Sequence, residues 1–407
     1  MENIKLDPGY RNQIKAISQA LILSESQVRS SIRRSFDGNT SADLTPLFRF
    51  FQKAKLGKAI TVAAIGGSIT EGASARSHEN GGNNAPEYTE KLNGEKSWVT
   101  RMKEWFWQQF GEEKVTVINA GIGATPSFLG TFRLEEMVLK HNPDLVLVEF
   151  SVNDSSTFHN LLENEIFEAY ESILRRLLER GCAVIPVFMT DRDNGSLHRE
   201  HTRITQHYRL PCISYYDAIR SDDELICDWF RISPDEVHPN NVGHALMAIC
   251  LCNYLRHIFL SCDDASPVSQ SPLPAPLYQD TFYRVRTLFA KDLLPLSSGG
   301  FQLVENLPRF QNKQWKGLLI AENQEGELTV TVPAGVKRFW VQYYHCVGSY
   351  ETEFCGRTKV TNTSAVGWPR AFWDRIYTGE ALAQDTVFHL KTRKRGQVVL
   401  IALLMSY

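Results

Sequence analysis

The sequence predicts an α/β fold: a three-layer α/β/α domain on a parallel sheet of about five strands, followed by a C-terminal β-sandwich or jelly-roll domain. Short apolar runs alternate with longer helix-period stretches between residues 58 and 261, and this alternation is typical of βαβ units. After a proline-rich linker, short runs rich in branched and aromatic residues predict antiparallel strands. The 407 residues suffice for two hydrophobic cores.

The strands of the first domain are expected where apolar residues run without interruption, because a central parallel strand is covered on both faces. These strands are expected at Ile60–Ile65, Val115–Ile118, Asp144–Phe150, Cys182–Phe188 and Cys212–Tyr215. Amphipathic periodicity predicts helices at Trp98–Phe110, Phe128–His141, Glu163–Arg180, Ser196–Tyr208 and Asn241–Leu260. Ligands of such sheets bind beyond the carboxyl ends of the strands, so chemistry is expected in the residues that follow each strand.

Four segments are expected along the chain. Residues 1–57 form a helical lead-in, 58–261 the α/β domain, 262–293 the linker with a short helix near Asp280–Leu293, and 294–407 the β-domain. Strands of the β-domain are predicted at Gly317–Ala321, Glu327–Val332, Arg338–Tyr344, Arg357–Val360 and Val398–Met405.

Composition and charge argue against several classes of function. Lys plus Arg number 44 and Asp plus Glu 46, a formal charge of -2, whereas proteins that bind nucleic acid usually carry a basic excess. The N-terminus MENIKLDPGY carries charges where a signal peptide would be apolar, and no apolar run approaches the ~20 residues that span a bilayer. The eight cysteines form no Cys-x-x-Cys pair. We therefore expect a cytoplasmic protein with buried thiols, no cofactor, and neither a membrane nor nucleic acid as partner.

Polar motifs stand at the ends of three predicted strands and before the last helix. Ser68 follows two glycines at the end of the first strand, and the second strand ends in the glycine-rich NAGIGATPS, whose backbone N–H groups could stabilise an oxyanion. Asn153 follows the third strand and could donate to the same oxyanion. Asp235 precedes His238 by three residues, which lets a carboxylate hold one imidazole nitrogen while the other faces a nucleophile.

Each motif also has an ordinary interpretation. A Gly-Ser turn is common, Asn and Asp often cap helices, and a single histidine is more often structural. The conjunction of the four motifs, in order and at successive strand ends of one sheet, favours a catalytic constellation.

Together the motifs resemble the SGNH hydrolase family, also called GDSL esterases and acylhydrolases. GGSIT is similar to its first block, with G-G-S in place of G-D-S; NAGIGAT to its second; SVND to its third, G-x-N-D; and DEVH to its last, D-x-x-H. The resemblance covers about residues 55–260, and the stretch from GGSITEGASA to SVND looks especially like a bacterial branch with an added β-domain.

The resemblance implies roles for individual residues. Ser68 would be the nucleophile, His238 the general base and then acid, and Asp235 the residue that orients His238. The backbone N–H groups of Ser68 and Ala124 and the side chain of Asn153 would hold the oxyanion. Ala124 stands where many members have glycine, so either the residue before it, Gly123, or Ala124 itself could supply the backbone donor.

The function that the resemblance implies is hydrolysis of O-acyl esters, with acetyl esters of a carbohydrate as the expected substrates. The partner would be an acylated small molecule or an oligosaccharide; the oligomeric state stays open. Two alternatives remain: an acyltransferase that uses a sugar hydroxyl in place of water, and a glycan-binding protein with weak esterase activity.

Two further features have weaker interpretations. The polar segment 73–96 follows the serine turn and is either a lid over the site or a surface insertion. A metal site is conceivable from Asp191, Asp193, His198, His201 and His207. Their spacing is not H-E-x-x-H, so no metal is expected.

Overall fold

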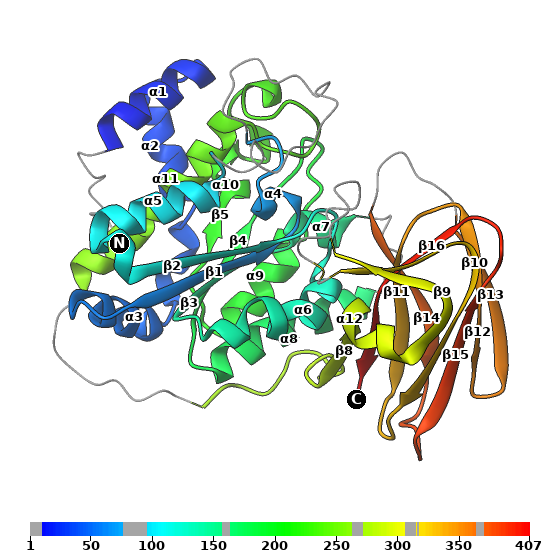
Figure 1. Cartoon of the computed structure of the whole chain (residues 1–407). Helices are drawn as coiled ribbons and strands as arrows, with labels where there is room; N and C mark the ends of the chain where they lie inside the picture. The colour runs from blue at the N-terminus through cyan, green and yellow to red at the C-terminus, as the bar shows by residue number, and fades with distance from the viewer. Residues whose placement is uncertain are drawn as a thin grey trace. The chain divides into compact units, whose positions relative to one another are not determined.

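The computed structural model describes residues 10–75, 96–156, 163–262, 272–305, 315, 317–363 and 370–407. The chain divides into two compact units, Met1–Gln279 and Asp280–Tyr407 (Figure 1). Each unit is described by itself below.

The first unit is organised around a parallel sheet with the strand order β2-β1-β3-β4-β5. Its strands are β1 (Ile60–Gly66), β2 (Val115–Gly121), β3 (Leu145–Glu149), β4 (Ala183–Phe188) and β5 (Ile213–Ser214). The register pairs Gly66 at the end of β1 with Gly121 of β2 on one side and Glu149 of β3 on the other. The carboxyl ends of these three strands therefore meet at one edge, and the predicted parallel sheet of five strands is confirmed.

Helices connect the strands and cover both faces of the sheet (Figure 1). They are α1 (Arg11–Leu21), α2 (Glu25–Arg34), α3 (Thr45–Lys55), α4 (Ser68–Glu71), α5 (Trp98–Phe110), α6 (Ser127–Met137), α7 (Ser151–Ser155), α8 (Glu163–Glu179), α9 (His198–His207), α10 (Tyr215–Ile219) and α11 (Asn241–Ser261). Alternate strand residues enter two different cores, because successive side chains of a strand point to opposite faces. Val62 packs in a cluster with α3, α5 and α11, whereas Ala63 packs in a second cluster with α6, α8 and α9. The predicted three-layer α/β/α architecture is confirmed.

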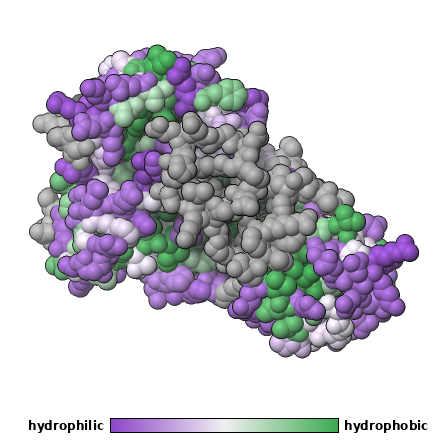
Figure 2. All heavy atoms as spheres, turned by 45° about the horizontal axis from the view of Figure 1, so that its top comes forward, coloured by the Kyte–Doolittle hydropathy of each residue, from purple (hydrophilic) through white to green (hydrophobic). Residues whose placement is uncertain are grey.

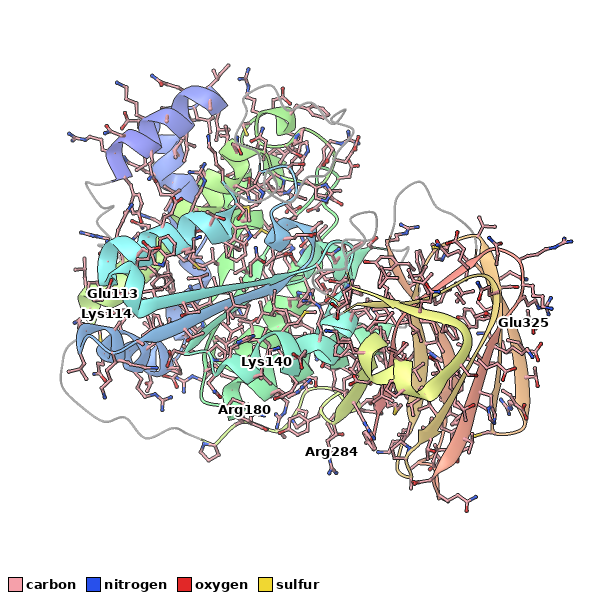
Figure 3. All side chains as sticks on the ribbon, in the orientation of Figure 1. Glu113, Lys114, Lys140, Arg180, Arg284 and Glu325 are labelled. Carbon is pink, nitrogen blue, oxygen red and sulfur yellow. The ribbon has the colours of Figure 1, made fainter. Side chains whose placement is uncertain are left out.

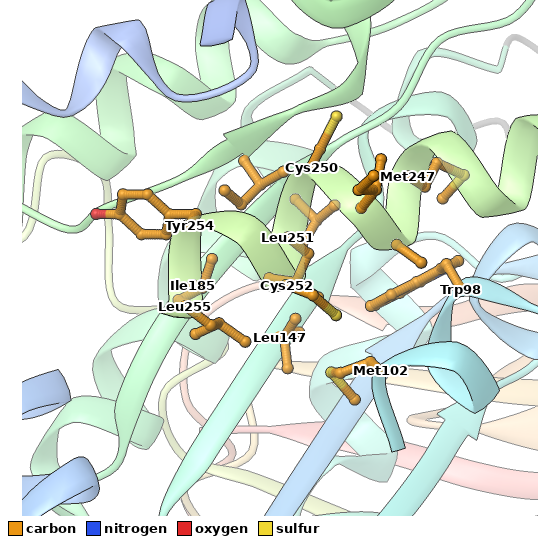
Figure 4. Packing of buried hydrophobic residues seen from close by; sticks show 14 of the residues in the cluster. Trp98, Met102, Leu147, Ile185, Met247, Cys250, Leu251, Cys252, Tyr254 and Leu255 are labelled. Atoms are coloured by element: carbon orange, nitrogen blue, oxygen red, sulfur yellow. The ribbon is translucent and has the colours of Figure 1, made fainter. Parts of the chain in front are cut away.

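Helix α11 lies inside the first of these cores. Figure 4 shows Met247, Cys250 and Leu251 of α11 among Leu147 of β3 and Trp98 of α5. Among the described residues, α11 is the helix whose length and composition would allow it to cross a membrane. However, 72% of its most apolar window is buried inside the unit, as expected for the central helix of a core.

The N-terminal helices belong to this same core. α1 contributes Ile14 and Ile17, and α2 contributes Val28 and Ile32, to the cluster that covers one face of the sheet. The described part of the expected lead-in is thus built into the α/β unit, because its amphipathic helices have their apolar faces covered only there.

The second unit is an antiparallel sheet that comprises nine strands within the described residues. The strands are β8 (Val285–Phe289), β9 (Ser297–Val304), β10 (Leu318–Val332), β11 (Arg338–Tyr344), β12 (Gly348–Phe354), β13 (Arg357–Thr363), β14 (Ala371–Thr378), β15 (Thr386–Thr392) and β16 (Gln397–Ser406). β10 pairs with β9, β15 and β16, and β16 also pairs with β8 and β11. The sheet thereby branches around one apolar cluster, and the predicted antiparallel β-domain is confirmed.

Two details of this unit differ from the sequence-based expectation. Of the short helix expected at Asp280–Leu293, only α12 (Ala290–Leu293) is helical, because Val285–Phe289 form β8, which pairs with β16. The unit accordingly begins at Asp280, earlier than the expected residue 294. The two strands expected at Gly317–Ala321 and Glu327–Val332 are parts of one strand, β10, interrupted by a register shift in its pairing with β9.

Charged side chains lie on the outside of both units. Glu113, Lys140, Arg180 and Glu325 are exposed and extend away from the ribbon in Figure 3. The coloured surface in Figure 2 is largely hydrophilic, with apolar residues in separate patches.

Candidate active site

Ser68 is the first residue of α4, directly beyond the carboxyl end of β1. Neither of the two preceding glycines has room for a side chain. A β-carbon on Gly66 would lie 2.5 Å from the backbone oxygen of Glu149, and one on Gly67 would lie 1.8 Å from Oδ1 of Asn153. The glycines therefore let β3 and Asn153 approach the serine closely. Gly67 stands where G-D-S sequences have aspartate, and the Asn153 side chain already occupies that space.

The structure brings Ser68, His238 and Asp235 together. Ser68 Oγ lies 2.9 Å from His238 Nε2, and His238 Nδ1 lies 3.0 Å from Asp235 Oδ2. The His238 and Asp235 side chains are 30% and 23% exposed, so the imidazole can be reached from outside. Burial by itself would raise the pKa of Asp235, but hydrogen bonds from His238 and from the Val237 N–H hold it below its ordinary value. Asp235 is thus an anion at neutral pH and can stabilise a protonated His238.

Short-range hydrogen bonds shape the loop that carries Asp235 and His238. Asp235 Oδ1 accepts the backbone N–H of His238 at 2.6 Å, and Ser233 Oγ contacts the backbone oxygens of both residues at 2.7 Å. Trp229 Nε1 donates to the backbone oxygen of Asp235 at 2.6 Å. Asn240 then caps α11 by accepting N–H bonds from its first turn.

The loop after β2 carries the two residues considered as backbone oxyanion donors, Gly123 and Ala124. The Gly123 N–H donates to Glu71 Oε2 at 2.8 Å and is therefore occupied. Ala124 has a φ of 55°, in the left-handed region where glycine is favoured. Within the described residues no acceptor is found for the Ala124 N–H, which favours Ala124 over Gly123 as the oxyanion donor.

Asn153 lies in α7, one turn beyond the end of β3, and is 8% exposed. Its Oδ1 lies 1.8 Å from the position that a β-carbon on Gly67 would take, so its amide lies next to Ser68, the residue that follows Gly67. The following residue, Asp154, accepts the Ser127 N–H at 2.7 Å and so ties the start of α6 to this turn. The turn that carries Asn153 is thus bonded to the start of α6, the helix that follows the loop of Gly123 and Ala124.

A buried carboxyl group of β3, that of Glu149, supports the turn that carries Ser68. Thr70 Oγ1 donates to Glu149 Oε2 at 2.9 Å. Burial raises the pKa of Glu149 to about 7, against the opposing effect of hydrogen bonds from Thr70 and the Gly67 N–H. Glu149 was not identified from the sequence, because a single charged residue at the end of an apolar strand does not indicate a functional role.

Two other charged residues near the site were also not identified from the sequence. Glu71 follows Ser68 by three residues and bonds the Gly123 N–H. Arg133 is 1% exposed within α6 and donates to the Gly66 oxygen at 2.7 Å. The available signal for Arg133 was its position as the only charge in the otherwise apolar start of that helix, SFLGTFRL.

The residues considered for a metal are used in other ways. His201 lies 3.1 Å from Asp154 and stacks on Tyr170, while His198 stacks on Tyr216. Asp191 accepts N–H bonds of its own loop. In the part of the chain that the structure describes, no group of three His, Cys, Asp or Glu residues is placed to hold a metal ion. Residues 76–95 of the expected lid segment lie outside the described residues.

Comparison with known proteins supports the assignment of the first unit. The model of the GDSL-like lipase/acylhydrolase family matches residues 64–246, which include Ser68, Ala124, Asn153, Asp235 and His238. A search of curated protein sequences found no match.

Solved structures resemble the whole chain. Two crystal structures of a two-domain esterase (CEX) active on acetylated mannans, one co-crystallized with mannopentaose, are each 24% identical and cover 92% of this chain, with TM-scores of 0.71 and 0.72. The alignments cover 97% and 98% of those chains. An acetyl xylan esterase, AlAXEase, is 20% identical over 47% of this chain and 98% of its own, with a TM-score of 0.37.

The two-domain similarity shows that the fold of both units occurs together in another protein. The family match and the four motifs concern the α/β unit, where the serine, histidine and aspartate meet. Over residues 64–246 the first unit is similar to the GDSL-like lipase/acylhydrolase family, the SGNH hydrolases, which supports a serine esterase of that type.

Proposed function

We propose that the protein removes acetyl groups from a carbohydrate through Ser68, His238 and Asp235. The observation that carries this proposal is the 2.9 Å contact between Ser68 Oγ and His238 Nε2, with Asp235 on the other ring nitrogen. A serine and an imidazole within hydrogen-bond reach, with the imidazole oriented by an anion, form an activated nucleophile.

In the first half of the reaction, Ser68 Oγ attacks the ester carbonyl carbon while its proton passes to His238 Nε2. Asp235 stabilises the imidazolium that results. The negative charge on the former carbonyl oxygen is met by the backbone N–H groups of Ser68 and Ala124 and by the Asn153 amide. The bond to the alcohol oxygen then breaks, and His238 returns the proton to that oxygen, so a sugar hydroxyl leaves and an acetyl-serine remains.

Water completes the cycle. His238 takes a proton from the water as the water oxygen attacks the acetyl carbon, and the same donors hold the second oxyanion. The bond to Ser68 Oγ then breaks, His238 returns the proton to Ser68 Oγ, and acetate is released. No cofactor is needed for either half.

The substrate class is supported by the two-domain neighbour, which acts on acetylated mannans and matches this chain over 92% of its length. The same order of an α/β unit followed by a β-rich unit supports a glycan ester over a free lipid ester.

The test compares acetate release from acetylated manno- and xylo-oligosaccharides, and from 4-nitrophenyl esters of two to eight carbons, by wild type and Ser68→Ala. Wild type should prefer acetyl esters and release acetate from at least one oligosaccharide, whereas Ser68→Ala should be inactive. Ser221→Ala, which changes an exposed serine, is the matched control. Equal hydrolysis by wild type and Ser68→Ala would contradict the proposal.

Acyl transfer to a sugar hydroxyl would pass through the same acetyl-serine. Adding an unacetylated oligosaccharide should leave acetate release unchanged if water is the acceptor. A fall in acetate matched by newly acetylated sugar would identify a transferase instead.

A further inference from the structure

We propose that Glu71 is a positioning residue for the oxyanion hole: its carboxylate holds the Gly123 N–H, so that the next N–H, that of Ala124, is left to the substrate oxygen. This inference rests on the proposed function, since it assigns a role in the same reaction. Glu71 does not contact the reacting atoms; it acts through the backbone of the loop.

The end of β2 and helix α4 are in direct contact, and this contact places Glu71 beside the loop. A β-carbon on Gly121 would lie 2.2 Å from the backbone nitrogen of Glu71, so only glycine permits the approach. Asn119 Nδ2 also donates to the Thr70 oxygen at 2.9 Å. Because the two backbones lie this close, Glu71 Oε2 accepts the Gly123 N–H at 2.8 Å.

The loop needs such an anchor because Ala124 is strained. A left-handed φ of 55° is less favourable for an alanine than the right-handed region. If the Gly123 N–H were released, the adjoining peptides could rotate and relieve that strain. The Ala124 N–H would then no longer be fixed toward the site.

Arg133 holds the other side of the same loop. Its guanidinium donates to the Gly66 oxygen at 2.7 Å, to the Ala120 oxygen, and to Thr125 Oγ1 at 3.2 Å. Thr125 Oγ1 in turn donates to the Ile122 oxygen at 2.7 Å. The residue after Ala124 is therefore fixed from α6, and the residue before it from α4.

Opposing electrostatic effects act on the Glu71 carboxyl group. Burial raises the pKa of Glu71 to about 7, while the Gly123 N–H, Arg133 and His238 favour its charged form.

The experiment measures kcat and KM for 4-nitrophenyl acetate, and the affinity for a small boronic acid that forms a tetrahedral adduct with a serine, in Glu71→Ala and Glu71→Gln. Glu71→Ala should lower kcat about 10- to 100-fold, less than the about 10²–10³-fold for loss of an oxyanion donor itself. KM should change little, and the boronic acid should bind more weakly by a factor close to the loss in kcat. Glu71→Gln, which keeps an acceptor oxygen, should recover most of the loss.

Two controls separate positioning from simple stability. Glu104→Ala removes an exposed glutamate of α5 and should behave as wild type, and thermal unfolding should show both Glu71 variants folded at the assay temperature. Wild-type kcat and boronic acid affinity in Glu71→Ala, or a loss that matches the unfolded fraction, would overturn the inference while Ser68→Ala still supports the proposed function. An active Ser68→Ala variant would overturn the proposed function and this inference with it.

Discussion

Two loops meet at Ser68, and they are held in place in different ways. In the loop of Asp235 and His238, the side-chain hydrogen bonds of Ser233 and Asp235 within the loop join residues at most five positions apart, and Trp229 donates to the Asp235 backbone oxygen from six positions away. In the loop of Ala124, by contrast, the partner of the Gly123 N–H is 52 residues away. The first loop is shaped mainly by bonds within its own sequence, with one backbone bond from Arg192 to Glu236, and the second depends more on distant residues.

This difference separates what each loop contributes. The first supplies side chains whose chemistry can be identified by residue type, a carboxylate and an imidazole. The second would supply a backbone N–H, which every residue except proline possesses, so only the orientation of that N–H makes it useful. The following predictions test whether the two loops depend on local and distant contacts as described.

The largest effect is expected from Asp235→Asn. The asparagine oxygen can still accept the N–H bonds of Val237 and His238 that shape the loop, but its amide would face His238 Nδ1 as a donor. The wrong imidazole tautomer should lower kcat by about 10⁴-fold with the fold intact. Steady-state kinetics with a thermal unfolding control measures this. Asp222→Asn, at an exposed left-handed position that asparagine tolerates, is the control. A loss below about 10-fold would remove Asp235 from the triad.

Asn153→Ala should have the next largest effect. Loss of one oxyanion donor should lower kcat by about 10²–10³-fold without unfolding the protein, because the Asn153 side chain fills space next to Gly67 rather than joining a core cluster. Kinetics and circular dichroism of Asn153→Ala, with the exposed Asn164→Ala as control, provide the measurement. A near-normal rate in a folded variant would exclude Asn153 from the mechanism.

Glu149→Gln tests a distant support of the nucleophile turn through its pH dependence. The pKa of Glu149 is raised to about 7 in the folded state, so at pH 5 the folded protein keeps a proton that the unfolded chain largely loses. Stability from this group is present below the ordinary carboxyl pKa and is lost as pH rises to about 7, by an amount on the order of 3 kcal/mol.

Calorimetry of wild type and Glu149→Gln between pH 5 and pH 8 measures this effect. The unfolding midpoint of the variant should fall less with rising pH, because glutamine accepts the Thr70 hydrogen bond without ionising. Identical pH dependence in both proteins would show that Glu149 does not titrate in this range.

The smallest effect is expected from Ala124→Gly. Glycine relieves the left-handed strain, about 1–2 kcal/mol, but adds about 0.4–1 kcal/mol of chain entropy to the unfolded state. The net gain in stability should be below about 1 kcal/mol, and kcat should hardly change because the N–H is retained. Urea unfolding and steady-state kinetics check both. A large loss of kcat would mean that the alanine methyl group itself shapes the site.

The accuracy of the sequence-based prediction differs between the two units for a physical reason. Strands of the first unit, such as β3 with LVLVE, are continuous apolar runs, so composition alone marks them. Strand β8, with VRTLF, was expected to be helical and is a strand because β16 pairs with it. Strand β12, with GSYETEF, has few apolar residues, and its exposed positions carry glutamates. Its pairing with β13 and β15, rather than its composition, makes it a strand.

By itself, the sequence determined the parallel sheet, the order of the four motifs and the candidates Ser68, Asp235 and His238, because periodicity and short-range spacing are written locally in the chain. Only the tertiary structure decided which N–H of the oxyanion loop is free. It also decided that Gly67 must be glycine beside Asn153, and that Glu71 and Arg133 hold the loop from either side. These features depend on backbone direction and on contacts between distant residues, and neither can be predicted from the local sequence pattern.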